Sequence, residues 1–190
     1  ALPGVDLVDI IISLGIFAVI LVIFAESGLL IGFFLPGDSL LFTTGVLYST
    51  GILPGNVPIS IHLFVLLLFI AAVLGDTVGY WFGRKTGHHI FRKPDARIFK
   101  QKYIKKAQEF YEKHGGKTII MARFIPIVRT FAPVVAGAAK MEYRKFLTYN
   151  MIGGFLWTVG ITYLGYFVGI GLTNAGIDID TIILPIIVLI

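Results

Sequence analysis

The chain contains 190 residues, of which 56% are hydrophobic and 14% are charged, and its mean hydropathy is +0.87. Soluble domains carry about a quarter charged residues. The composition therefore excludes a disordered tail, a nucleic-acid-binding module and an ordinary cytosolic enzyme, and it indicates an integral membrane protein of one domain, residues 1–190.

The formal net charge of +5 conceals a strong separation of charge along the chain. The segment from Arg84 to Lys145 holds all 16 basic residues and four acids, a net +12, whereas the rest holds seven acids and no base. Basic residues near membrane spans stay in the cytoplasm. Residues 84–117 are therefore expected inside, and the loops at 51–60 and 171–180, which have no basic residue, outside.

Residues 10–53 are expected to form a first helix and a re-entrant hairpin. The apolar run up to residue 35 is interrupted at Pro36, Gly37 and Asp38. The following run, 40–53, has only 14 residues, or about 21 Å at ~1.5 Å per residue, which is too short to cross a ~30 Å hydrocarbon core.

The next two segments differ in character. Residues 61–83 form an apolar stretch of 23 residues that ends in a basic pair, which predicts a transmembrane helix running inward. Residues 95–114 place apolar side chains at helical spacing among many lysines. This pattern predicts a cytoplasmic amphipathic helix that either contacts anionic membrane lipids or packs on the protein's own cytoplasmic face.

Residues 118–144 are predicted to form a second re-entrant hairpin, because basic residues stand at both ends of an apolar stretch. Expected breaks in this hairpin are Pro126, Pro133 and Gly137. Residues 146–170 then form a transmembrane helix running outward, and 179–190 begin a last helix. The predicted fold class is all-α integral membrane.

Spacing within the two hairpins indicates an inverted repeat. Glu26 precedes Pro36 by ten residues, and Arg123 precedes Pro133 by ten. The helices that follow carry the same motif, Gly79-Tyr80-x-x-Gly83 and Gly165-Tyr166-x-x-Gly169. Inverted repeats with broken helices are typical of secondary transporters, whose binding site lies between the repeats.

Four charged residues lie inside the predicted hairpins: Glu26, Asp38, Arg123 and Arg129. A charge at membrane depth costs at least ~2.5 kcal/mol and marks a functional site by default. Paired arginines suit bidentate phosphate binding, and paired carboxylates suit proton coupling. The alternative is two structural salt bridges, Glu26–Arg123 and Asp38–Arg129, that only hold the hairpins together.

Supporting residues are expected in the neighbouring helices. Asp76 is predicted to complete the polar site, and Asn150 to form an interhelical hydrogen bond. Glycines at every fourth position from Gly75 to Gly87 predict close helix packing. The four histidines show no metal-ligand spacing and the chain has no cysteine, so neither a metal nor a cofactor is expected.

These residues and their neighbours resemble the DedA family, also called the SNARE-associated or VTT-domain family. The resemblance rests on two groups of motifs: Phe24-Ala-Glu26, Phe34-Leu-Pro-Gly-Asp38-Ser39 and Gly75-Asp76-x-x-Gly79-Tyr80-x-x-Gly83-Arg84 in the first half, and Arg123-Phe124-x-Pro126-x-x-Arg129, Pro133-x-x-Ala136-Gly137, Asn150 and Trp157 in the second. It implies a multi-pass protein of the bacterial inner membrane with two opposed hairpins. It also implies that Glu26 and Asp38 are the essential acids and Arg123 and Arg129 the essential arginines.

The resemblance implies a flippase that recycles a polyprenyl-phosphate carrier lipid, undecaprenyl phosphate, in dependence on the proton-motive force. A proton-coupled small-ion antiporter and a phospholipid scramblase remain alternatives. A lipid phosphatase is not expected, since residues 123–133 contain no His, Cys or Ser that could act on a phosphate. The expected partners are lipids and not nucleic acid, and the sequence predicts no oligomeric state.

Overall fold

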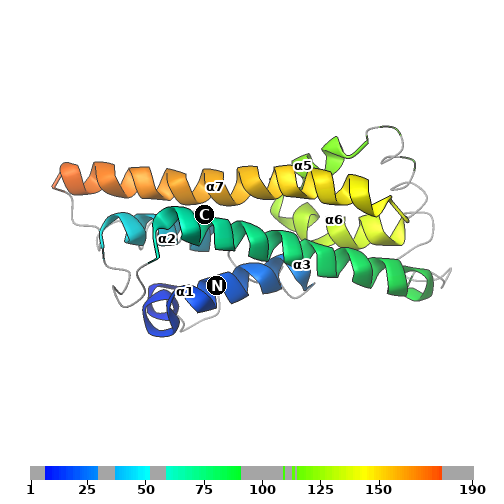
Figure 1. The fold of residues 1–190 in the computed structure, drawn as a ribbon, viewed down its shortest axis with the longest axis horizontal. Coiled ribbons are helices and arrows are strands. Elements are labelled where there is room, and N and C mark those ends of the chain that lie inside the picture. The colour runs from blue at the N-terminus through cyan, green and yellow to red at the C-terminus, as the bar shows by residue number, and fades with distance from the viewer. Residues whose placement is uncertain are drawn as a thin grey trace. The chain divides into compact units, whose positions relative to one another are not determined.

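The computed structural model describes residues 7–29, 37–51, 59–90, 109, 113 and 115–176, and these residues contain helices and no strand (Figure 1). The helices are α1 (Leu7–Gly28), α2 (Gly37–Ser49), α3 (Ile61–Ile90), α5 (Lys117–Ala122), α6 (Pro126–Ala138) and α7 (Tyr143–Asn174). The all-α class is confirmed for this part of the chain. The helix predicted at 179–190 lies outside the described residues, as does that at 95–114 apart from two positions.

The chain divides into two compact units, which are described one at a time. Unit 1 comprises Ala1–Ile23, Phe34–Ala71 and Leu156–Ile190. Unit 2 comprises Phe24–Phe33 and Ala72–Phe155. Helices α1, α3 and α7 therefore each contribute residues to both units.

Helices α3 and α7 are long and apolar enough to cross a membrane, over Ile61–Gly87 and Tyr143–Asn174. Both exceed the predicted spans of 61–83 and 146–170. Many of their large apolar side chains are exposed, and on α3 these recur every three or four residues along one face. In water such a stripe is unfavourable, whereas lipid chains solvate it. The α3 stripe consists of Leu63, Leu66, Ile70, Leu74, Val78, Trp81 and Phe82.

In unit 2 the glycine face of α3 packs against two other helices, as the four-residue spacing predicted. Gly75 lies in backbone contact with Gly28 of α1, so that a Cβ on either residue would clash with the other. Gly83 lies against the backbone of Val134 in α6, and Gly87 lies against Ala138. These contacts bring α1 and α6 close to the middle of α3, where the polar residues of unit 2 lie.

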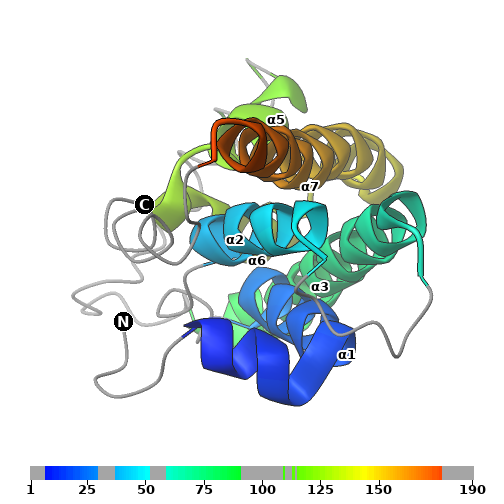
Figure 2. The ribbon, with the colours of Figure 1, turned by 90° about the vertical axis from the view of Figure 1, so that its left-hand side faces the viewer.

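In unit 1, α2 lies beside α7 in a similar close contact (Figure 2). Gly45 of α2 approaches backbone atoms of Thr162 and Tyr166, and Gly165 of α7 approaches the backbone of Phe42. In unit 2 the corresponding contacts join Gly137 to Tyr80 and Arg84, and Gly83 to Val134. In both units the two contacting residues of the shorter helix are three positions apart, and the two residues of the longer helix that contact its glycine are four positions apart.

The repeated contacts shift the register suggested by the shared motif. The sequence aligns Gly79 with Gly165, but the packing makes Gly83 the counterpart of Gly165, one helical turn later. Gly87 likewise corresponds to Gly169. Gly87 lies against Ala138, which follows Gly137 in α6, and Gly169 lies against Val46, which follows Gly45 in α2. The two motifs therefore make similar helix contacts, but the equivalent glycines are offset by four residues from the alignment of the motifs.

Pro133 does not interrupt the helix, contrary to the break predicted at this residue. It lies inside α6, which begins at Pro126 and continues to Ala138. Proline lacks an N–H, so only the hydrogen bond to the carbonyl of Arg129 is lost, and close packing against α3 holds the helix together. Gly137 also lies within α6, and Gly37 begins α2, whereas Pro36 lies outside the described residues.

A buried aromatic cluster fixes α3 to the start of α7 in unit 2. The ring of Tyr80 is fully buried and stacks on Phe146 with 4.7 Å between centroids. Its hydroxyl donates a hydrogen bond to the carbonyl of Met141, in the turn that joins α6 to α7. Arg84 donates to the same hydroxyl at 2.6 Å and lies over the ring of Trp81.

Replacing Gly83 by alanine should destabilise the protein by about 1–3 kcal/mol, because the new methyl group overlaps the backbone of Val134. The free energy of unfolding in mixed SDS–detergent micelles measures this change. Gly160→Ala is the matched control: this helical glycine has no neighbour within 4 Å, so alanine should stabilise by about 0.5–1 kcal/mol. Equal effects of the two substitutions would contradict the packing described here.

Candidate functional site

An ion pair between the buried Glu26 and the partly buried Arg129 joins α1 to α6 in unit 2. Glu26 lies in the last turn of α1 and is 2% exposed, and Arg129 lies one turn into α6. The Nη2 atom of Arg129 donates to Oε1 of Glu26. Because α1 and α6 both pack on α3, the two side chains meet in the interior rather than at an exposed surface.

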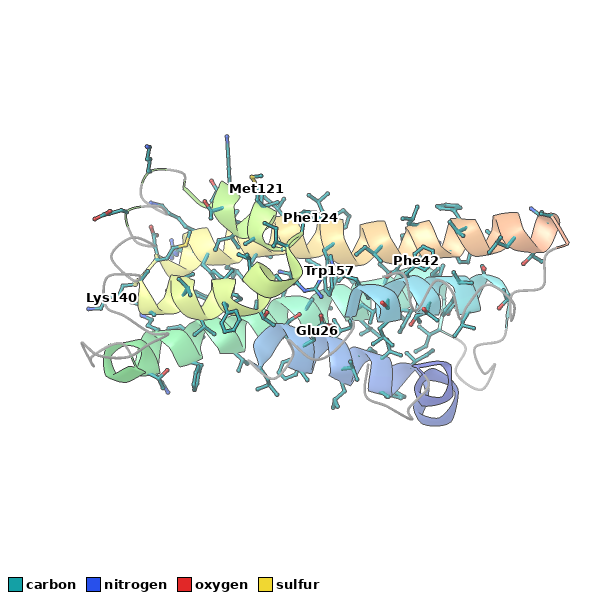
Figure 3. All side chains as sticks on the ribbon, turned by 180° about the vertical axis from the view of Figure 1, so that it is seen from behind. Glu26, Phe42, Met121, Phe124, Lys140 and Trp157 are labelled. Atoms are coloured by element: carbon teal, nitrogen blue, oxygen red, sulfur yellow. The ribbon has the colours of Figure 1, made fainter. Side chains whose placement is uncertain are left out.

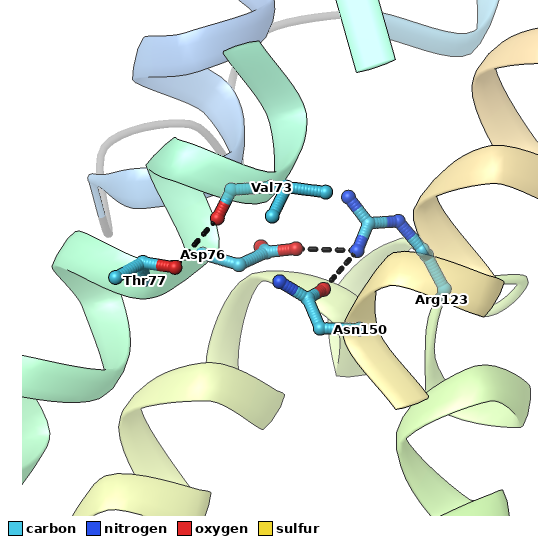
Figure 4. A network of polar contacts seen from close by, with 5 residues as sticks. All are labelled: Val73, Asp76, Thr77, Arg123 and Asn150. Carbon is cyan, nitrogen blue, oxygen red and sulfur yellow. Dashed lines mark hydrogen bonds and ion pairs between the residues drawn. The ribbon is translucent and has the colours of Figure 1, made fainter. Parts of the chain in front are cut away.

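A second buried network centres on Arg123, in the turn between α5 and α6 (Figure 4). Its Nη1 atom donates both to Oδ2 of Asp76 on α3 and to Oδ1 of Asn150 on α7. Asp76, Arg123 and Asn150 are all buried. The turn places the guanidinium there because α5 packs on α7, where Gly153 leaves room for the Arg123 side chain.

Asp38 belongs to unit 1 and has a different kind of partner. It lies in the first turn of α2, and its Oδ1 accepts a hydrogen bond of 2.6 Å from Nε1 of Trp157 on α7. Trp157 is buried and points into the interior from α7 (Figure 3). The indole nitrogen is a neutral donor, so this contact orients the carboxylate without neutralising its charge.

The two networks of unit 2 give it a balanced set of buried charges. Glu26 and Asp76 supply two carboxylates, and Arg123 and Arg129 supply two guanidiniums. Separating either pair removes the close opposite charge from a group in an apolar interior, which is unfavourable. Another anion can nevertheless take the place of a carboxylate on arginine, provided that the carboxylate is protonated, since the site then stays neutral.

Most of the residues predicted for the site come together in unit 2: Glu26, Asp76, Arg123, Arg129 and Asn150. The structure shows two ion pairs that were not considered from sequence. The structure joins Glu26 to Arg129 and Arg123 to Asp76, so that Asp76 is a direct ion-pair partner rather than a peripheral polar group.

The sequence does not predict Trp157 as a partner of Asp38. A signal for its role does exist in the sequence. Trp157 follows Asn150 by seven residues, or two helical turns, so both lie on the same face of α7. The spacing thus places two residues with side-chain hydrogen-bonding groups on one face of α7.

Replacing Glu26 by alanine should reduce the free energy of unfolding by about 3–5 kcal/mol, because the Arg129 charge stays buried without this carboxylate. Titration with SDS in mixed micelles measures the loss. Glu142→Ala is the control, since Glu142 forms an exposed pair with Lys145 at 3.5 Å, and its removal should cost less than ~1 kcal/mol. Similar losses would show that Glu26 is not neutralised in the interior.

Comparison with known proteins identifies related membrane proteins. Residues 35–167 match the family model of the VTT domain. The chain is 53% identical over 149 residues to Protein DedA of Escherichia coli (strain K12), an overlap that covers 78% of this chain and 66% of DedA. It is 37% identical over 153 residues to Inner membrane protein YqjA of the same strain, covering 80% and 67% of the two chains.

An uncharacterized membrane protein of Mycobacterium leprae (strain TN) is 46% identical over 154 residues, covering 80% of this chain and 65% of the relative. The chain thus spans about two thirds of the length of these relatives. No solved structure matches it.

Proposed function

Because the chain belongs to the VTT-domain family of membrane proteins, which includes DedA, we propose that it is a proton-coupled flippase in the bacterial inner membrane. Its substrate is a polyprenyl-phosphate carrier lipid, undecaprenyl phosphate, whose phosphate binds Arg129 and Arg123. The observation that carries this proposal is the buried pair between Arg129 and the titratable Glu26.

The pair provides a way to exchange a proton for a phosphate. When Glu26 takes up a proton it no longer neutralises Arg129, and a phosphate anion replaces it. The site is neutral before and after the exchange, so neither state leaves an isolated charge in hydrocarbon. Release of the lipid lets Glu26 ionise again, and the cycle moves one proton with each phosphate.

Arg123 has a different place in the proposal. Asp76 and Asn150 both accept hydrogen bonds from its Nη1 atom, and these fix the position of its guanidinium. Arg123 then forms the fixed part of the phosphate site and Arg129 the exchangeable part. Asp38, held by Trp157 in unit 1, is the second proton carrier.

The proposed architecture is an inverted repeat of two re-entrant hairpins. The support for it is the contact pattern common to α2 with α7 and α6 with α3, in which the glycine contacts recur at the same intervals. Such repeats suit transport because the substrate site then lies near the midplane. A hydrolytic reaction is not part of the proposal, since residues 123–133 contain no His, Cys or Ser that could act on a phosphate.

Arg129→Lys should reduce translocation of polyprenyl phosphate about 10–100-fold, because one charged hydrogen bond worth about 1.5–3 kcal/mol is lost with the planar guanidinium. Proteoliposomes containing a labelled lipid measure the rate. Arg144→Lys, at an exposed residue of α7, should have no effect. A small-ion antiporter needs only a point charge at this position, so full activity of Arg129→Lys would favour that alternative.

Glu26→Gln should weaken the dependence of phosphate-lipid binding on pH. In the wild type, binding is accompanied by proton uptake at Glu26, so affinity rises as pH falls. Glutamine cannot titrate, so the remaining slope comes from the lipid phosphate and from the other titratable groups, Asp38 among them. Measuring the dissociation constant from pH 5.5 to 8 for both proteins separates the two contributions. Identical slopes would exclude Glu26 as the coupling residue.

A further inference from the structure

Threonines on the described helices commonly satisfy their own hydroxyl groups. The hydroxyl donates to the carbonyl of the residue four positions earlier in Thr44, Thr77, Thr86, Thr148 and Thr173. This arrangement is the ordinary one in a helix that has little water around it. It needs no partner from another helix.

Thr43 of α2 and Thr162 of α7 depart from this pattern in unit 1. Their exposed fractions are 2% and 0%, and the hydroxyl oxygen of each has no hydrogen-bond partner in the described part of the chain. A buried hydroxyl that lacks a partner destabilises the fold. Both residues could donate to their own helix as Thr44 does, so their orientation indicates another partner.

The packing of α2 on α7 places these two hydroxyl-bearing residues at the same level. Asp38 contacts Trp157, Phe42 lies against Gly165, and Gly45 lies against Thr162; further along, Val46 and Ser49 lie against Gly169. The two helices therefore run parallel. Thr43 follows Asp38 by five residues in α2, and Thr162 follows Trp157 by five residues in α7. Five residues correspond to about 7.5 Å along a helix, at ~1.5 Å per residue.

Further buried polar residues lie between these two levels. Ser39 precedes Thr43 by four residues and Thr158 precedes Thr162 by four, so each pair shares one face of its helix. Ser39 and Thr158 are both buried. Oxygen atoms thus follow α2 and α7 from the carboxylate of Asp38 to the two threonines.

We propose that ordered water is bound inside unit 1 by the hydroxyls of Thr43 and Thr162, and that it extends to Asp38 and conducts protons to that carboxylate. Buried waters typically make about three hydrogen bonds to polar groups that otherwise lack partners. About two waters, at ~2.8 Å between oxygens, bridge the distance. A water that gives a proton to Asp38 takes one from the next water, so the chain of waters is unchanged overall.

The water site itself stands on burial and packing alone, whereas its role in proton conduction rests on the proposed function. Thr43→Val and Thr162→Val test the first part, because valine keeps the shape and removes the hydroxyl. If water is bound, each should lower the melting temperature by about 2–4 °C. Thr44→Val is the matched control and should change it less, since that hydroxyl bonds only to its own helix.

A rise in melting temperature in both valine variants would show that the interior is dry and would overturn the water site. A sodium ion is the other occupant that suits a site lined by oxygens. Melting in sodium chloride is therefore compared with melting in N-methylglucamine chloride at equal ionic strength. A sodium-dependent rise in the wild type that disappears in Thr162→Val would also overturn the proposal, in favour of a cation.

The proton pathway is tested in proteoliposomes that contain polyprenyl phosphate and a pH-sensitive dye. Each valine variant should slow proton uptake at least about tenfold, and Thr162→Ser should restore it, while affinity for the phosphate lipid stays unchanged. Normal uptake in the valine variants would overturn the pathway. Absence of uptake in the wild type would instead refute the coupled transport proposed above and the pathway with it, leaving the water site to the melting experiment.

Discussion

A charge inside a membrane has to be neutralised within the protein, and this constraint shapes unit 2. Glu26 is neutralised by Arg129, and Asp76 by Arg123 with the help of Asn150. These partners come from α1, α3, α7 and the segment containing α5 and α6, so the ion pairs form only when all four are packed together. A salt bridge of this kind adds little net stability to the fold. It does disfavour other helix arrangements, because these would leave the charges apart in an apolar interior.

Small residues make that arrangement possible. The backbones of α1 and α3 touch at Gly28 and Gly75, and those of α3 and α6 touch at Gly83. Side chains on larger residues would hold the helices apart and separate the carboxylates from the guanidiniums. The glycines of α3 leave the outer surface of that helix free to present large apolar side chains to lipid. Close packing and the polar interior therefore depend on each other.

Much of this organisation could be predicted from the sequence, because membrane helices follow simple rules of length, apolarity and charge. The positions of α3 and α7 and the glycine face of α3 follow from those rules. Helix ends and the effect of Pro133 were less predictable. A proline costs one hydrogen bond, and whether that ends a helix depends on how tightly the remaining turns are packed.

The sequence by itself determined that the chain is an all-α membrane protein with buried acids and arginines, since apolar length and isolated charges are properties of local segments. Only the tertiary structure decided which charges pair. Glu26 lies 103 positions from Arg129, and Asp76 lies 47 from Arg123, and no spacing rule connects residues on different helices. The partners are chosen by the close contacts between helices, because an ion pair in an apolar interior forms only where packing brings both groups within hydrogen-bond distance.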